Sequence, residues 1–372
     1  MNRSNVLEIK KALKMTAGEV NAIDTICTCL VNGKNEILMK NTEKFARLDE
    51  EEQFKYADII KATLSGTIDK KLINLEIEND NKAMLSNVHK YIFSSEKERD
   101  AFFLSVIENY SFGENYLIVA AHGIYDAPVK TSDGKALEDE TNTYDFIIVS
   151  ICPMHSTKAG LSFDTKEKRM TNAGQMQIAK APVNGFLYPA FNERESDDRV
   201  ILYFTKDPED NHPEFMEYLI GHSAPISSSY QQKIFENIIS EVTDDKADLE
   251  LYKTLQDNLT TMTKENDKSS KEKKLTKSDI KHILKDAGIS DDKLSDFDHI
   301  YERAGGNDSY KFTSQNLITL EKFNIKAPDV EIKVKPDKRK MIRQEVIGGK
   351  NCIIVELEEG DIKVNKVLVK RL

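Results

Sequence analysis

Hydrophobic positions recur with two different periods along the chain, and these periods separate predicted helices from predicted strands. Val6, Ile9 and Leu13 recur at the spacing of an amphipathic helix. Apolar runs bounded by turn residues predict strands at Ala22–Val31, Glu36–Met39, Leu72–Ile77, Tyr116–Ala121, Phe146–Cys152, Gly185–Phe191 and Val200–Thr205. Further helical periodicity predicts helices at Glu50–Leu64, Lys82–Ile92 and Glu96–Tyr110. Strands and hairpins in the middle of this region favour an α+β fold with a mixed sheet over regular βαβ alternation.

The C-terminal part begins with helical periodicity and ends with alternating strands. Thr276 and Asp279 have the spacing of a capping box, and Gly288 is placed to end that first helix. Ser290 is placed to cap a second helix, whose apolar face is Leu294, Phe297, Ile300 and Tyr301. The strands that follow are VEIKVK, MIRQEVIGGKNCIIVELEEGDIKV and KVLVKRL, with Gly348-Gly349 as a hairpin turn. This order predicts a small domain of a helical hairpin followed by β-strands.

A polar segment separates the two parts. Residues 264–275 are dense in lysine, serine and acidic residues and contain one large apolar side chain, Leu275, which is typical of a charged linker. We therefore predict an α+β domain over residues 1–263 and a second domain over residues 276–372. Their charges differ: residues 1–263 hold 29 Lys+Arg against 43 Asp+Glu (−14), and residues 264–372 hold 24 against 20 (+4), which together give the net charge of −10. Such asymmetry indicates either two modules with different surfaces or a chance difference to which the lysine-rich linker contributes.

Composition narrows the class of protein. The chain has 372 residues, of which 39% are hydrophobic and 31% charged, with a mean hydropathy of −0.51. No apolar run approaches the roughly 18 residues of a membrane span, and the first residues lack the apolar core of a secretory signal, so we expect a cytoplasmic protein without membrane contact. The four cysteines show no metal-ligand spacing, so we expect reduced thiols, no metal site and no cofactor.

Two C-terminal patterns bear on nucleic-acid binding. The spacing around Gly288 resembles a helix-turn-helix, but five carboxylates on the second helix would repel phosphate. We therefore favour a helical hairpin used for packing or protein contact over a helix that reads DNA. The following strands carry a basic cluster, which consists of Lys333, Lys335, Lys338, Arg339, Lys340 and Arg343. This cluster either binds nucleic acid or a protein partner, or keeps an edge strand soluble.

One histidine ends an apolar run and is therefore a candidate for catalysis. In YLIVAAHGIYDAP, alternation places His122 on the same strand face as Ile118 and Ala120. Asp126 is near enough in sequence to bond it across a turn, and Cys152 and His155 follow the next predicted strand. A general base needs an orienting partner and a nucleophile, but no nucleophile-elbow motif is present. We interpret His122 as a structural histidine at a strand end, with a site of His122, Asp126, Cys152 and His155 as the catalytic alternative.

Several stretches together resemble a known family. TLSGT, YLIVAAHGIYDAP, SICPMHSTKAGLSFD, NGFLYPAFNERESD and PDVEIKVKP occur in this order. Together they resemble an uncharacterised domain-of-unknown-function family of clostridia and related Firmicutes, and this resemblance implies no activity. The stretch LKDAGISDDKLSDF and the strand-rich ending also resemble the bacterial 37-kDa nucleoid-associated protein family. That second resemblance implies contact with nucleic acid through the basic cluster.

These patterns leave three hypotheses of function. The first is a non-enzymatic binding protein, nucleoid- or nucleic-acid-associated through the basic cluster. The second is a hydrolase with a site near His122 and Cys152. The third is a protein-interaction scaffold whose acidic N-terminal part meets a basic partner or its own C-terminal half. Substrate, partner and oligomeric state do not follow from the sequence.

Overall fold

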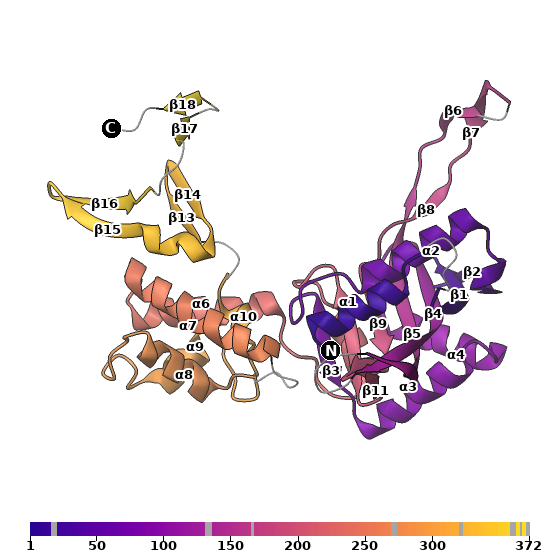
Figure 1. The fold of residues 1–372 in the computed structure, drawn as a ribbon, viewed down its shortest axis with the longest axis horizontal. Coiled ribbons are helices and arrows are strands. Elements are labelled where there is room, and N and C mark those ends of the chain that lie inside the picture. The colour runs from indigo at the N-terminus through magenta and orange to yellow at the C-terminus, as the bar shows by residue number, and fades with distance from the viewer. Residues whose placement is uncertain are drawn as a thin grey trace. The chain divides into compact units, whose positions relative to one another are not determined.

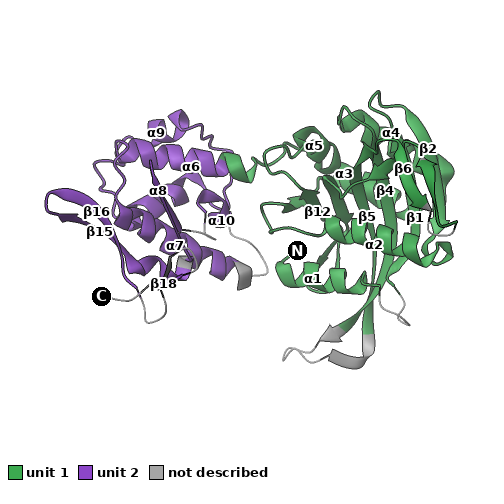
Figure 2. Cartoon of the chain, turned by 90° about the horizontal axis from the view of Figure 1, so that it is seen from above, with its two compact units in different colours: residues 1–230, 269–272 green, residues 231–268, 273–372 purple. Residues whose placement is uncertain are grey.

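The chain forms two compact units. The computed structural model describes residues 1–15, 21–130, 136–164, 167–268, 274–319, 323–357, 362–364 and 367–369. The first unit comprises residues 1–230 and the second comprises residues 231–268 and 273–372 (Figure 2). This division falls before the predicted boundary at residue 263, because helices α6 (Ser228–Val242) and α7 (Leu249–Lys268) pack with the C-terminal elements. For example, the Asn237 side chain donates a hydrogen bond to the Ala304 carbonyl at 3.3 Å.

An antiparallel sheet forms the centre of the first unit. Its strand order is β2-β1-β4-β5-β9-β12-β3, and β8 pairs with β5. The strands are β1 (Ile23–Val31), β2 (Ile37–Lys44), β3 (Leu72–Glu76), β4 (Tyr116–Lys130), β5 (Ala136–Ser156), β8 (Gln177–Ala179), β9 (Asn184–Tyr188) and β12 (Val200–Thr205). The predicted α+β class is confirmed. The sheet is not mixed as predicted, because every pairing among these described strands is antiparallel.

Helices cover both faces of this sheet (Figure 1). They are α1 (Arg3–Ala12), the 3₁₀ helix η1 (Phe45–Arg47), α2 (Glu50–Thr63), α3 (Asn79–Tyr91), α4 (Glu96–Asn109) and α5 (Pro213–Ile220). On one face α1 and α2 bury Ile9 and Ile60 against a core that includes Phe146 of β5. On the other face α3, α4 and α5 bury Leu85 and Phe103, among others, against the sheet. Since both faces are covered, the central strands are nearly continuous apolar runs rather than alternating ones.

Local sequence signals set the ends of several helices. Asn2 and Asn5 form a reciprocal capping box at the start of α1, and the Asp49 carboxylate accepts from the backbone of Glu52 at the start of α2. Ser95 caps α4 in the same way. These caps satisfy backbone donors that have no partner within the helix.

Several strands extend further than predicted. The pairing of β4 with β5 continues past Ala121 as far as Lys130, so the predicted strand end at Ala121 is wrong. Beyond β5 a hairpin of β6 (Gly160–Asp164) and β7 (Arg169–Ala173) extends away from the body of the unit (Figure 1). A second small hairpin joins β10 (Ala190–Asn192) to β11 (Glu195–Asp197).

The second unit has helices followed by hairpins, in the predicted order. Its remaining elements are α8 (Lys277–Asp286), α9 (Phe297–Arg303), α10 (Ser314–Leu317), the 3₁₀ helix η2 (Pro336–Met341), and the hairpins β13 (Phe323–Ala327) with β14 (Val330–Val334), β15 (Ile342–Ile347) with β16 (Lys350–Val355), and β17 (Ile362–Val364) with β18 (Val367–Val369). Thr276 and Asp279 form the expected capping box. The second helix begins at Phe297 rather than after Ser290, because turns occupy the residues between them.

The predicted linker is partly structured. Of residues 264–275, the first five belong to α7, which ends at Lys268, and Leu275 forms a β-bridge with Phe312. Residues 269–273 lie outside the described part of the chain. Among the helices that the structure describes, none has the length and apolar character needed to cross a bilayer.

Candidate functional site

His122 lies within β4 and not at a strand end as predicted. It is opposite Thr25 of β1 and Ile147 of β5, so strands flank it on both sides. Its side chain is 18% exposed and lies on the sheet face covered by α3, together with Ile118 and Ala120. The shared face agrees with the predicted alternation. A half-buried histidine in the middle of a sheet needs polar partners, and the neighbouring strands supply them.

A β-bulge brings one of these partners to His122. In the register of β1 against β4, Ile23 is opposite Gly123 and Thr25 is opposite His122, so Asp24 is the extra residue. The Asp24 carboxylate accepts a hydrogen bond from His122 Nδ1 at 3.2 Å. It also accepts from the Lys44 ammonium at 2.8 Å and from the Thr25 hydroxyl at 2.7 Å. The bulge therefore places a carboxylate, itself held by other groups, against one ring nitrogen of His122.

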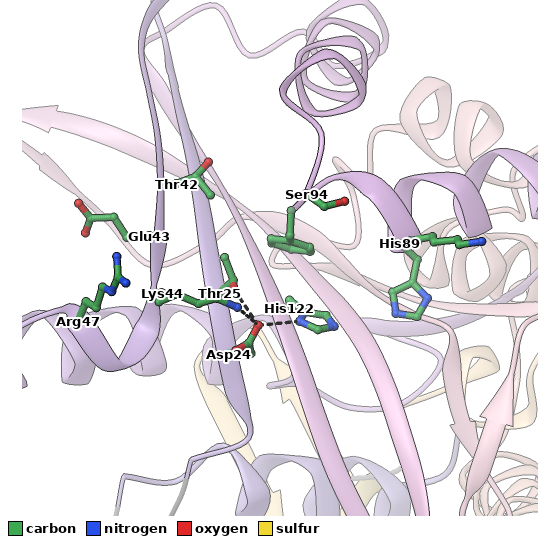
Figure 3. Close-up of a pocket in the computed structure, with 11 residues that line it drawn as sticks. Asp24, Thr25, Thr42, Glu43, Lys44, Arg47, His89, Ser94 and His122 are labelled. Atoms are coloured by element: carbon green, nitrogen blue, oxygen red, sulfur yellow. Dashed lines mark hydrogen bonds and ion pairs between the residues drawn. The ribbon is translucent and has the colours of Figure 1, made fainter.

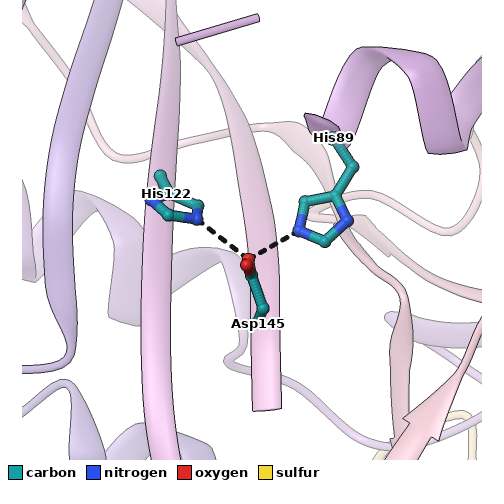
Figure 4. Close-up of side chains that lie close together, drawn as sticks. All are labelled: His89, His122 and Asp145. Atoms are coloured by element: carbon teal, nitrogen blue, oxygen red, sulfur yellow. Dashed lines mark hydrogen bonds and ion pairs between the residues drawn. The ribbon is translucent and has the colours of Figure 1, made fainter. Parts of the chain in front are cut away.

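The other ring nitrogen meets a carboxylate that two histidines share. Asp145 of β5 lies diagonally across from His122, and its Oδ1 accepts from His122 Nε2 at 2.9 Å (Figure 4). The same oxygen accepts from His89 Nε2 at 2.7 Å. His89 comes from the last turn of α3, so a helix and two strands meet at one oxygen atom. The three ligand atoms, one from each residue, lie within 4.8 Å of one another, and this group could hold a metal ion.

The carboxylates set the protonation of His122. Because both of its nitrogens face carboxylates, these contacts favour the form of the ring in which both nitrogens donate, the imidazolium. Burial acts to lower the pKa of His122, but the hydrogen bonds to Asp145 and Asp24 raise it above the ordinary value. Burial acts to raise the pKa of Asp24, but hydrogen bonds from Lys44, Thr25 and His122 lower it to about 2. Asp145 is likewise held ionised: burial opposes this, yet its bonds from His122 and His89 keep its pKa well below the usual range.

A cavity of about 680 Å³ opens beside this network (Figure 3). Its lining residues are Asp24, Thr25, Thr42, Glu43, Lys44, Arg47, His89, Lys90, Phe93, Ser94 and His122. Strands β1, β2 and β4 and the end of α3 contribute most of these residues. The volume is within the roughly 300–1,000 Å³ of typical small-molecule sites. Cationic groups, two carboxylates, hydroxyls and one aromatic ring thus surround a space suited to a polar ligand.

The structure does not bring the other predicted catalytic residues to His122. Asp126 lies further along β4, where its carboxylate accepts from the Thr143 hydroxyl at 2.8 Å. Cys152 is opposite Leu117, five residues along β5 from the position opposite His122, or about 17 Å along the strand. Burial raises the pKa of Cys152 to about 12, which disfavours the nucleophilic thiolate. His155 is exposed and lies opposite Ile178 of β8.

Within the described part of the chain, three of the six residues of the predicted basic cluster form ion pairs with carboxylates. Lys333 contacts Glu331 at 3.0 Å, and Arg343 contacts Glu345 at 3.0 Å. Arg339 is buried and forms an ion pair with Asp257 of α7, so it belongs to the packing of the second unit. The three other members of the cluster lie in or beside η2: Lys335 and Lys340 are exposed, and Lys338 is partly buried. Binding of nucleic acid through this cluster stays a prediction.

Sequence reasoning found His122 but missed Asp24, His89 and Asp145. Two weak signals were present. Asp145 precedes Ile147 and Val149 by two and four residues, so strand alternation places its side chain on the same sheet face as theirs. On α3, His89 follows the buried Leu85 by four residues, so the two lie on the same helix face. A charged residue at a position where the periodicity expects a buried apolar side chain indicates a paired or functional group. No local signal marked Asp24, because its role depends on the register of β1 against β4.

The comparisons with known proteins identify the family. No curated protein matches the chain. One family model matches residues 1–367, and its description is domain of unknown function, DUF4317. The match spans residues of both units. The chain therefore belongs to the DUF4317 family.

Proposed function

We propose that the first unit is a ligand-binding module whose cavity receives a small molecule with an oxyanion group, such as a phosphate or a carboxylate. The observation that carries the proposal is the 680 Å³ cavity with cationic groups on its wall. The proposal keeps the binding role that the sequence predicts, and it moves the binding site from the basic cluster to the cavity beside His122.

The charges around the cavity favour an anionic ligand. Lys44 is neutralised by Asp24, but within the described residues no carboxylate lies within 4.0 Å of a side-chain nitrogen of Arg47 or Lys90. His122 lines the same wall, but both of its ring nitrogens contact carboxylates, so Arg47 and Lys90 are the cations that carry the proposal. A guanidinium presents a planar set of donors that matches carboxylate and phosphate oxygens. Arg47 and Lys90 come from different elements, η1 and α3, and both line the cavity, so a bound oxyanion would contact the two cations.

The remaining lining groups fit the non-ionic part of such a ligand. The hydroxyls of Thr42 and Ser94 donate to Cys27 Sγ and to the Tyr91 carbonyl, so their oxygens offer acceptors to a ligand. The Phe93 ring offers an apolar wall. Phe93 also contacts the His122 ring, with centroids 5.3 Å apart, so it fixes one side of the imidazolium. A metabolite with a polar body and one anionic group meets these requirements better than an uncharged or cationic molecule.

Calorimetric titration of the full chain tests the proposal. The probes are inorganic phosphate, glucose 6-phosphate, AMP and succinate, which separate phosphate from carboxylate recognition. The Arg47→Gln variant is expected to weaken binding of the best probe by about tenfold or more, since a charge-assisted contact is lost. Lys55→Gln is the matched control, because Lys55 is exposed on α2, which covers the opposite sheet face. Unchanged binding by Arg47→Gln, or no binding of any probe, contradicts the proposal.

A further inference from the structure

Two imidazoles and one carboxylate converge at the wall of the cavity. We propose that His89, His122 and Asp145 bind one divalent transition-metal ion of the zinc class. This inference goes beyond the binding of an oxyanion and does not require it, because the metal ligands are separate from Arg47. Metal binding releases the proton that His122 Nε2 shares with Asp145 in the metal-free protein, so the ring binds the ion as a neutral imidazole.

The distances suit one ion. The Oδ1 atom of Asp145 lies 2.7 Å from His89 Nε2 and 2.9 Å from His122 Nε2, and all three ligand atoms lie within 4.8 Å of one another. Zinc bonds of about 2.0–2.2 Å place two ligand atoms of the same ion at most about 4.4 Å apart. Small rotations of the side chains therefore suffice to surround an ion. The ligands come from α3, β4 and β5, so the packed sheet and helix fix their relative positions.

A second observation points to metal ligation by His122 in particular. Histidines that bind metals almost always donate their other ring N–H to a carboxylate, a carbonyl or a water, which fixes the orientation and the tautomer of the ring. Asp24 occupies that position, 3.2 Å from Nδ1, and Lys44 holds Asp24 at 2.8 Å. The contact with Asp24 orients the ring so that its Nε2 atom points toward Asp145. Asp24 is a positioning residue in this proposal and not a metal ligand.

The ligand types select the class of metal. Imidazole suits Zn²⁺, Co²⁺, Ni²⁺ and Fe²⁺, whereas Mg²⁺ and Ca²⁺ prefer sets of oxygen ligands. Three protein ligands also leave a coordination position for water or another small ligand. His89 and His122 both line the cavity, so that position is reached from the cavity side. The arrangement is that of an open metal centre and not that of a closed structural one.

Titration of the untagged, EDTA-treated full chain with Zn²⁺ tests the inference, and Co²⁺ serves as a spectroscopic probe. We expect one high-affinity ion per chain, a visible Co²⁺ absorption band, and no competition from excess Mg²⁺. His89→Gln and Asp145→Asn each remove one ligand and are expected to weaken Zn²⁺ binding at least about 100-fold. Asp24→Asn is expected to weaken it about 10–100-fold, as losses of outer carboxylates do.

Control variants separate this site from other histidines. His155→Gln removes an exposed histidine elsewhere on β5 and is expected to bind Zn²⁺ as the unchanged protein does. Circular dichroism of each metal-free variant shows that it is folded, and two independent ligand variants ensure that one misfolded variant does not decide the result. The inference is overturned if the unchanged protein gives no Co²⁺ band, or if both folded ligand variants keep full Zn²⁺ affinity.

Discussion

Replacing Gly123 with alanine tests how closely β4 and β5 pack beside the site. Gly123 follows His122 on β4 and lies opposite Phe146 of β5. A β-carbon at position 123 would lie 2.3 Å from Cζ of Phe146 and 2.6 Å from its Cε2. Carbon atoms that are not bonded do not approach so closely, so the ring or the two strands must move.

The packing around Phe146 sets the size of the effect. The Phe146 side chain is 1% exposed, and its ring stacks on Tyr144 with centroids 4.9 Å apart. The ring therefore has little room to move away. Overpacking of this kind typically costs about 1–3 kcal/mol, so we expect Gly123→Ala to lower the free energy of unfolding by about 2 kcal/mol. Because Asp145 and His122 adjoin the clashing residues, we also expect at least about a tenfold loss of Zn²⁺ affinity.

Urea unfolding followed by circular dichroism measures the stability effect. Gly160→Ala is the matched control, since no atom lies within 4 Å of its added β-carbon, and it is expected to change stability by less than about 0.5 kcal/mol. The double variant Gly123→Ala/Phe146→Leu removes the clashing ring atoms. It should be more stable than the sum of the single effects by about 1 kcal/mol or more. Strictly additive effects of the two substitutions on the free energy of unfolding would refute the reasoning. So would a Gly123→Ala variant that is as stable as the unchanged protein.

Three further predictions concern other parts of the chain. Burial raises the pKa of Cys152 to about 12, so a thiol reagent at pH 8 should modify partly exposed Cys352 first, and peptide mapping that finds Cys152 modified as fast would contradict this. Burial opposes ionisation of Asp197, but hydrogen bonding from Asn192 lowers its pKa, so its contribution to stability is full above the ordinary pKa of 3.8 and is lost as pH falls through the depressed value. Asp197→Asn should therefore lower the thermal midpoint at pH 7, and the difference from the unchanged protein should shrink below about pH 4. If the basic cluster binds nucleic acid, Lys340→Ala should reduce the salt slope of binding by about 1, and absence of binding at low salt would refute that hypothesis.

Much of the fold follows from local sequence signals. The periodicities that predict Glu50–Leu64 and Glu96–Tyr110 correspond to α2 and α4, because amphipathic spacing and caps are properties of neighbouring residues. The turn at Gly348-Gly349 is also confirmed, with φ values of 58° and 78° that glycine adopts readily. Strand ends were less predictable. Whether β4 continues past Ala121 depends on its partner strand, and the partner's position is not a local property.

The site could be predicted only in part, because register and strand order assemble it. His122 stands out in the sequence, but Asp24 lies 98 residues away from it and reaches it only through a bulge in β1. His89 depends on how α3 packs on the sheet. The same limit explains the basic cluster, where Arg339 has the sequence context of an exposed residue. Its partner Asp257 lies on α7, 82 residues away, and their contact buries the guanidinium.

A long-range ¹H–¹⁵N NMR spectrum of the imidazole groups tests the central claim most directly, which is that one carboxylate joins two histidines at the cavity. His89→Gln and His122→Gln assign the two rings in the metal-free protein. The structure predicts that Asp145→Asn shifts the Nε2 signals of both His89 and His122 and leaves the signals of the remaining histidines in place. A spectrum in which only one of these two rings responds, or neither, would contradict the site described here.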